Sequence, residues 1–90
     1  MDKTVTQNLI LKNIKRLNNS EMGNPNFKLT FESKALKFVT EVFTQDDYQI
    51  NYIIDHGIVD IDDLCKVTFK ADGEKKNLLL EDIRRHPSIN

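Results

Sequence analysis

Residues 5–17 read VTQNLILKNIKRL, a stretch rich in aliphatic and β-branched side chains that no Gly or Pro interrupts. This composition predicts a long first β-strand. Its alternation changes phase along the way, because Leu9 and Leu11 share one parity while Ile14 falls on the other. A bulge near Lys12 and Asn13 would return Ile14 to the buried side, and such bulges bend a sheet strongly. We therefore expect a curved first strand.

A loop and a second strand follow. Residues 18–26 consist mostly of turn-forming types, among them Gly23 and Pro25, and this predicts a long loop. The next six residues alternate between apolar and polar side chains, a period of two that predicts a half-buried strand. Its apolar parity holds Phe27, Leu29 and Phe31.

Residues 35–43 carry large apolar side chains on both parities, which predicts a third strand buried on parts of both faces. The spacing of Leu36, Val39 and Phe43 would also suit a helix. Thr44 then resembles a helix N-cap with Asp47 three residues later. We expect a short amphipathic helix that ends near residues 56–57, with recurring apolar side chains at Tyr48, Ile50, Tyr52, Ile53 and Ile54.

A hairpin is predicted nearer the end of the sequence, after a connector at residues 58–63 whose apolar side chains we expect beneath the sheet. Residues 65–71 alternate as a strand does, and Asp72-Gly73 is a pair preferred in two-residue type I′ turns. The returning strand would then run from Glu74 to about Glu81. Residues 82–90 indicate a strand end or a helical turn, followed by a frayed tail from about residue 86.

The expected order is strand, strand, strand, helix, strand, strand, within a single domain that takes up all 90 residues. A short antiparallel sheet avoids exposed edges best by closing on itself, and this order is that of the oligonucleotide/oligosaccharide-binding fold, the OB-fold. The sequence thus predicts a mainly β protein with one short helix, an OB-like five-stranded barrel. An SH3-like barrel and an α+β sheet packed on the helix are the alternatives.

Part of the chain resembles the opening of small, mostly uncharacterised bacteriophage proteins. The resemblance covers mainly residues 9–31: a strand ending in Lys-Arg-Leu, a turn containing Ser20, then Gly-Asn-Pro and an aromatic strand. It implies a phage or prophage origin rather than an activity. This chain has Asn26 where that group often places a basic residue before the aromatic, which weakens any charged role that the resemblance implies for the loop.

Charge is unevenly distributed along the chain. Residues 1–40 hold seven bases against three acids (+4), residues 41–65 seven acids and no base (−7), and residues 66–90 six bases against four acids (+2). A small body with this asymmetry can present a basic and an acidic face to charged partners. Alternatively, these charges are scattered over the solvated surface.

The basic residues suggest a surface for single-stranded DNA or RNA, which needs cations along its phosphates and flat rings beneath its bases. The candidate aromatic side chains are Phe27, Phe38 and Phe69. In the alternative interpretation these phenylalanines are core and the lysines are ordinary solvated residues. The candidate nucleic-acid-binding residues are Lys12, Lys15, Arg16, Lys28, Lys66 and Lys70.

The acidic segment gives a second hypothesis, that the chain binds a host or phage protein. Its carboxylates would mimic nucleic-acid phosphates and occupy a basic groove of a host protein, as an inhibitor does; an exposed strand edge would instead suit a virion assembly component. The candidate protein-binding residues are Asp46, Asp47, Asp60, Asp62 and Asp63. Residues 60–63 lack the spacing of a calcium loop, so we expect no metal site.

The sequence offers little for catalysis or for a cofactor. His56 and His86 have no Ser or Cys partner in a known local motif, and Cys65 sits on the parity of a predicted strand's apolar residues. We therefore expect a non-enzymatic binding protein with no cofactor. Without a long apolar run, the chain is expected in the cytoplasm, that of a bacterial host if it is phage-encoded, with no membrane contact. Its thin core favours a homo-oligomer.

Overall fold

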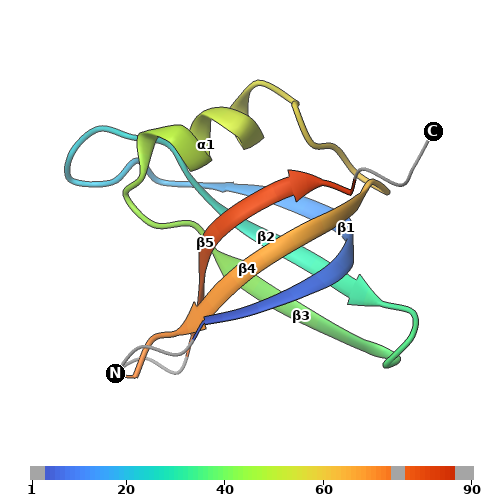
Figure 1. Cartoon of the computed structure of the whole chain (residues 1–90). Coiled ribbons are helices and arrows are strands. Elements are labelled where there is room, and N and C mark those ends of the chain that lie inside the picture. Colours follow the sequence, from blue (N-terminus) through green and yellow to red (C-terminus); the bar gives the residue numbers. More distant parts are fainter. Residues whose placement is uncertain (1–3, 74–76, 87–90) are drawn as a thin grey trace.

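The computed structural model describes residues 4–73 and 77–86. Its five strands form a closed barrel in the order β1-β2-β3-β5-β4, and the helix lies between the third and fourth strands in sequence (Figure 1). This is the predicted element order. Because the strands close into a barrel, the alternative of an α+β sheet packed on the helix is wrong. The elements are β1 (Thr4–Leu17), β2 (Asn26–Ser33), β3 (Phe38–Phe43), α1 (Tyr48–Asp55), β4 (Leu64–Ala71) and β5 (Leu78–Arg85).

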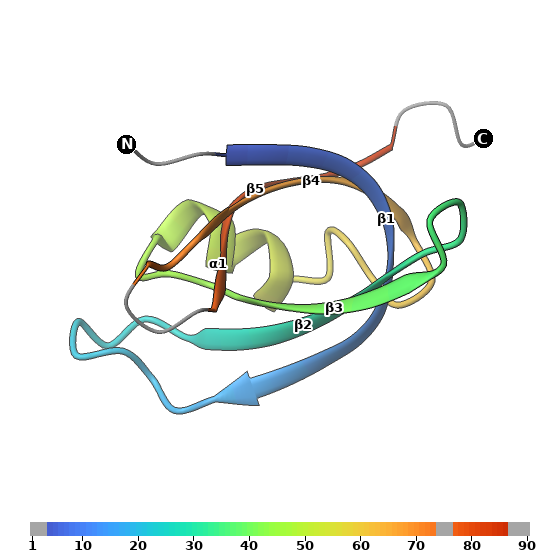
Figure 2. The ribbon, with the colours of Figure 1, turned by 90° about the horizontal axis from the view of Figure 1, so that it is seen from below.

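β1 belongs to both layers of the barrel. Its first half, Thr4–Ile10, pairs with β4, and its second half, Ile10–Leu17, pairs with β2. The pairing with β2 skips one residue between Leu11 and Asn13, so the predicted bulge is confirmed. Figure 2 shows β1 bending from the layer of β4 and β5 into the layer of β2 and β3.

The core fills the space between these two layers. The alternation predicted for β2 is confirmed, since its apolar parity is buried while the residues between are partly exposed. α1 covers one end of the barrel and contributes Ile50 and Ile54 to the core (Figure 1). The fully buried apolar side chains include Leu9, Leu11, Leu29, Phe31, Val42, Val67, Leu80 and Ile83.

The third strand is shorter than predicted. Residues 34–37 form a turn, in which Lys37 has a φ of 55° and the Ser33 hydroxyl accepts a hydrogen bond from the Leu36 N–H at 3.1 Å. β3 therefore begins at Phe38, opposite Ser33. The predicted burial on both faces is wrong, because Leu36 is 65% exposed in the turn and Val39 is 62% exposed on the outer face of the barrel.

The helix begins later than predicted. The buried Thr44 continues the β2–β3 pairing, as its N–H donates to the Phe27 carbonyl at 3.0 Å and its hydroxyl accepts from the Phe27 N–H at 2.9 Å. Asp47 is the N-cap instead, accepting from two backbone N–H groups of the first turn. The helix ends as predicted, with Gly57 at a φ of 68°. In the connector only Val59 is buried; Ile58 and Ile61 are exposed.

The predicted two-residue turn between β4 and β5 is wrong. The Asp72 N–H donates to the Asn77 carbonyl at 2.7 Å, and the strands pair from Ala71 opposite Leu78. The longer connection places Phe69 opposite Leu80 and Val67 opposite Ile83, so apolar side chains face one another in the core.

The end of the chain also differs from the prediction. β5 extends to Arg85 rather than ending near Glu81. The His86 N–H still donates to the Leu64 carbonyl at 2.8 Å, so this residue is anchored to the barrel. The rest of the predicted tail, residues 87–90, lies outside the described residues.

Candidate nucleic-acid interface

A groove of about 570 Å³ lies on the outer face of the barrel, over β2 and β3 and beside the start of β5. Because Leu29 and Val42 point into the core, their neighbours along the strands, Thr30, Glu41 and Phe43, point outward. We call this feature the β2–β3 groove. It is lined by Thr30, Val39, Thr40, Glu41, Phe43, Asn77 and Leu78.

Two lysines and an aromatic ring form a row across three strands at one end of this groove. Lys15 of β1 lies opposite Lys28 of β2, and Lys28 lies opposite Phe43 of β3. The Lys28 ammonium forms an ion pair with Glu41 at 3.2 Å, whereas Lys15 is exposed and has no ion pair with any other described residue. Positive charge and a half-buried ring thus lie side by side on the same face.

A second hollow continues the surface toward the β2–β3 turn and shares Val39 with the groove. It is bordered by the exposed Lys34 and Lys37, neither of which pairs with an acid in the described part of the chain, and by the half-buried Phe38. Neither lysine is among the candidates predicted from the sequence, because the third strand was expected to begin at residue 35 and the turn at residues 34–37 was not recognised. Recognising the turn would have placed them together.

Two of the predicted basic residues, Lys12 and Arg16, contact other groups of the chain. Lys12, at the bulge, binds Asp62 at 2.8 Å, and this hydrogen bond raises the pKa of its ammonium above the usual value. Arg16 lies over the ring of the buried Phe27, with its guanidinium carbon 5.5 Å from the ring centroid. It also donates to Asn19 at 2.8 Å and forms a long pair, 3.5 Å, with Asp55 of α1.

The other two predicted bases lie on the opposite side of the barrel. Lys66 and Lys70 point outward from β4, and Figure 2 shows β4 and β5 across the core from β2 and β3. Lys70 forms an ion pair with Glu81 at 2.9 Å. The six bases singled out from the sequence therefore do not form one surface, and only Lys15 and Lys28 lie together beside the groove.

The aromatic side chains near the groove are also not the ones that the sequence suggested. Phe27 and Phe69 are buried, as the alternative interpretation of the sequence held, so neither ring is available to a ligand. Phe43, half-buried at the groove, and Phe38, half-buried beside the turn, are the phenylalanines that reach the surface near lysines. The most exposed aromatic residue among those described is Tyr48 on α1.

The acidic candidates separate into two groups that flank α1 in the sequence. Asp46 accepts hydrogen bonds from the Ser20 hydroxyl at 2.8 Å and from the Asn24 side-chain amide at 2.6 Å, which ties the β1–β2 loop to the segment just before α1. Asp47 is the N-cap, and Asp62 pairs with Lys12. These carboxylates bind groups of the chain itself, which explains their positions without an external partner.

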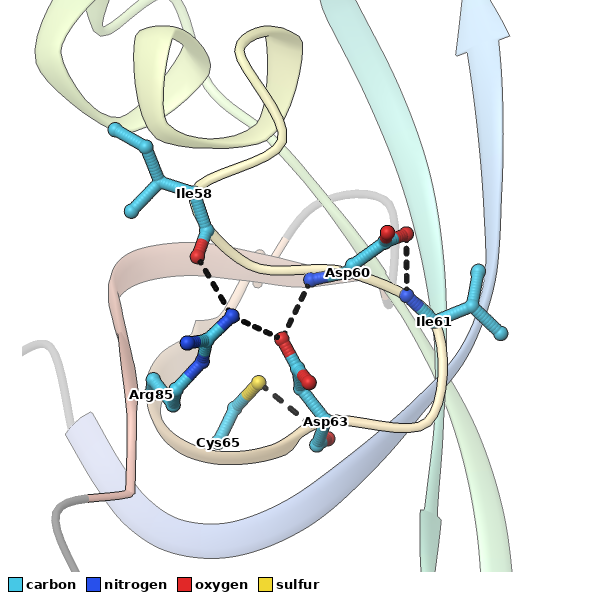
Figure 3. Close-up of polar contacts among 6 residues, drawn as sticks. All are labelled: Ile58, Asp60, Ile61, Asp63, Cys65 and Arg85. Atoms are coloured by element: carbon cyan, nitrogen blue, oxygen red, sulfur yellow. Dashed lines mark hydrogen bonds and ion pairs between the residues drawn. The ribbon is translucent and has the colours of Figure 1, made fainter. Parts of the chain in front are cut away.

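Figure 3 shows the second acidic group around Arg85, the last residue of β5. One carboxylate oxygen of Asp63 accepts from the Arg85 guanidinium at 3.1 Å and from the Asp60 N–H at 2.9 Å. Arg85 also donates to the Ile58 carbonyl at 3.5 Å. The cluster therefore fastens the connector to the end of the sheet.

Cys65 lies beneath this cluster, fully buried, with its thiol donating to the Asp63 carbonyl at 3.6 Å (Figure 3). Burial, and then the Asp63 carboxylate, raise the pKa of the thiol to about 11, so it stays protonated at neutral pH. Within residues 4–73 and 77–86, no group of three His, Cys, Asp or Glu side chains is arranged to hold a metal ion. None of the described helices is long and apolar enough to cross a membrane.

A solved structure is similar to this barrel over most of its length. It is the crystal structure of a mitochondrial single-stranded DNA binding protein from S. cerevisiae, Rim1; the match covers 94% of this chain and 96% of that one, with a TM-score of 0.68 and 17% sequence identity. This chain has an OB-fold. No protein-family model and no curated protein matches it, so the resemblance to bacteriophage proteins stays a prediction.

Proposed function

We propose that this chain binds single-stranded nucleic acid, DNA in the first instance, along the β2–β3 groove and performs no chemistry on it. The observation that carries the proposal is the row of Lys15, Lys28 and Phe43 beside the groove. A base stacked on an aromatic ring and a phosphate near a lysine are the two contacts on which binding of single strands without sequence preference depends. The match in fold to a protein named for single-stranded DNA binding supports the same conclusion.

The lysines at the two ends of the surface suggest a path for the strand. Lys15 and Lys28 lie at one end and Lys34 and Lys37 at the other, with the exposed Val39 between them. β3 has six residues, a length of about 20 Å. A path of this length suits a site near the lower end of the ~4–16 nucleotides that OB-folds occupy.

The proposal is tested by fluorescence anisotropy with a labelled oligothymidylate of about 12 nucleotides, within the usual OB-fold site size. We expect saturable binding at low ionic strength, with log affinity falling against log salt at about −0.7 per phosphate contacted, hence near −3 for four lysines. A duplex of equal length should bind more weakly, and an oligouridylate separates DNA from RNA preference. No binding at low salt, or affinity indifferent to salt, would refute the proposal.

Lys66 and Lys70 lie outside the proposed site, because they point outward from β4 and β4 lies across the core from β2 and β3. The groove is not evidence for a phage origin or for self-association, so both stay predictions. Protein binding is a second candidate function, and it rests on a different observation: the exposed tyrosines of α1.

A further inference from the structure

Three rings lie in a row along the solvent-facing side of α1. Tyr48, Tyr52 and His56 are spaced four residues apart, so they stack one above the next along the helix. The Tyr52 and His56 rings are 3.8 Å apart and nearly parallel, and the Tyr48 and Tyr52 rings are 6.1 Å apart. Tyr48 is 66% exposed and Tyr52 42% exposed, so both rings offer surface to a partner.

A hollow of about 230 Å³ opens beside this row, between α1 and the residue that precedes β2. Its volume lies below the ~300 Å³ at which small-molecule sites begin, so it suits a single inserted side chain rather than a metabolite. None of its residues belongs to the β2–β3 groove. The hollow is lined by Pro25, Tyr48, Asn51, Tyr52, Asp55 and His56.

The charge around the three rings indicates which kind of side chain would enter the hollow. Residues 44–58 include Asp46, Asp47 and Asp55 and no Lys or Arg. Asp46 and Asp47 accept hydrogen bonds from neutral donors, which leave their charge in place, and Asp55 is matched by Arg16 at the long distance of 3.5 Å. This face is therefore net negative, which disfavours a phosphate backbone and favours a cation.

We propose that the tyrosine face of α1 is a docking site for an arginine-bearing segment of a partner protein. A guanidinium is planar and weakly hydrated, so it can lie on an aromatic ring and donate to a carboxylate at the same time, which an ammonium does less well. Here the rings are Tyr48 and Tyr52 and the carboxylate is that of Asp55. Because this site and the groove share no residue, a partner protein and a nucleic-acid strand can bind to the chain at the same time.

The chain carries its own reporter for this site. It has two tyrosines and no tryptophan, so emission in the tyrosine band comes only from Tyr48 and Tyr52. The probes are three synthetic heptapeptides in which Gly alternates with Arg, with Lys or with Glu. We expect a saturable change in tyrosine emission with the Arg peptide, a weaker response with the Lys peptide and none with the Glu peptide.

Substitutions on the helix test the assignment residue by residue. Tyr48→Ala, read through the remaining Tyr52, should weaken binding of the Arg peptide about two- to fivefold, the range that one exposed cation–π contact supports. Asp55→Asn should weaken it as well, by removing the carboxylate that receives the guanidinium. Leu36→Ala is the matched control, because Leu36 is as exposed as Tyr48 but lies in the β2–β3 turn.

Several results would overturn the proposal. One is equal binding of the Arg and Glu peptides. A second is equal binding of the Arg peptide to Tyr48→Ala and to the unmodified chain. A third is a tyrosine response to oligothymidylate that the Arg peptide reverses, since that would make the row a stacking platform for bases. A further measurement uses only the unmodified chain, so it does not depend on a variant that folds. Amide chemical shifts recorded with the Arg peptide should change at residues 48–56. Changes only along β2 and β3 would also refute the site.

Discussion

Lys28 lies directly opposite Phe43 on the outer face of the β2–β3 pair, and its ammonium is held 3.2 Å from the carboxylate of Glu41 on the same neighbouring strand. Side chains opposite one another in an antiparallel pair are about 5 Å apart at their Cβ atoms, so charge and ring form one local unit. Glu41 therefore holds the Lys28 ammonium in place. In the proposed complex, a phosphate bound by Lys28 would displace Glu41 from this ion pair.

Phe43→Ala should weaken binding of oligothymidylate by about 1–3 kcal/mol, a loss of roughly 5- to 150-fold, because it removes the ring on which a base would stack. The measurement is the anisotropy titration, with circular dichroism to show that the variant remains folded. Phe43→Tyr keeps the ring and serves as the control. Equal affinity of Phe43→Ala and the unmodified chain would remove Phe43 from the site.

Glu41→Gln should strengthen the same interaction. The substitution frees Lys28 from its ion pair and removes a negative charge from the lining of the groove, while it keeps the size of the side chain. We expect the gain to be largest at low ionic strength and to fade as salt screens both effects. Glu81→Gln, which removes the ion pair of Glu81 with Lys70 on the other side of the barrel, is the matched control and should leave affinity unchanged. A loss of affinity in Glu41→Gln would contradict the proposed path.

Lys15→Ala and Lys66→Ala distinguish the two sides of the barrel. Both lysines are exposed, and neither has an ion pair within the described structure, but Lys15 lies beside the groove and Lys66 faces away from it. Lys15→Ala should reduce the magnitude of the salt slope by about 0.7, the value for one phosphate contact with a single strand. Lys66→Ala should leave the slope unchanged. The reverse outcome would place the nucleic acid on β4 and β5.

The parts of the fold that the sequence predicts are those where burial repeats with a fixed period. Alternation along β2 and the change of phase at Lys12 both follow from which side chains must enter the core, and both are observed. The order of the strands and the helix could be predicted for the same reason. The β4–β5 connection was not, because Asp72-Gly73 satisfies a local turn preference whereas the pairing of Phe69 with Leu80 is a long-range choice of the core.

The candidate site was harder to predict from the sequence than the fold. A list of bases does not say which face of a closed barrel each one occupies, and Arg16 and Lys12 found partners in segments far along the chain. The helix pattern marked Tyr48 and Tyr52 as apolar positions, yet both point to solvent. Helical spacing identifies residues that share a face, but only packing shows whether that face is covered.

Asp47→Ala should lower the free energy of unfolding by about 1 kcal/mol, because it removes the oxygen that accepts hydrogen bonds from the Gln49 and Ile50 N–H groups. Urea unfolding followed by circular dichroism measures the change. Gln49→Ala, an exposed substitution in the same helical turn, should change stability by less than about 0.5 kcal/mol. Equal effects of the two substitutions would mean that the cap adds nothing to stability.

Alkaline pH should destabilise the chain through Cys65. The pKa of its thiol is raised from 9.0 to about 11 in the folded state, so between these values the unfolded chain loses a proton that the folded chain keeps. The contribution of this group to the free energy of unfolding is complete below pH 9 and falls as pH rises toward 11, by at most about 1.4 kcal/mol per pH unit.

Urea unfolding across this pH range should show a steeper decline in the free energy of unfolding for the unmodified chain than for Cys65→Ala, which has no thiol to ionise. Since the two proteins differ only at residue 65, the difference between the two curves isolates the thiol. Parallel curves would show that burial does not hold this thiol neutral.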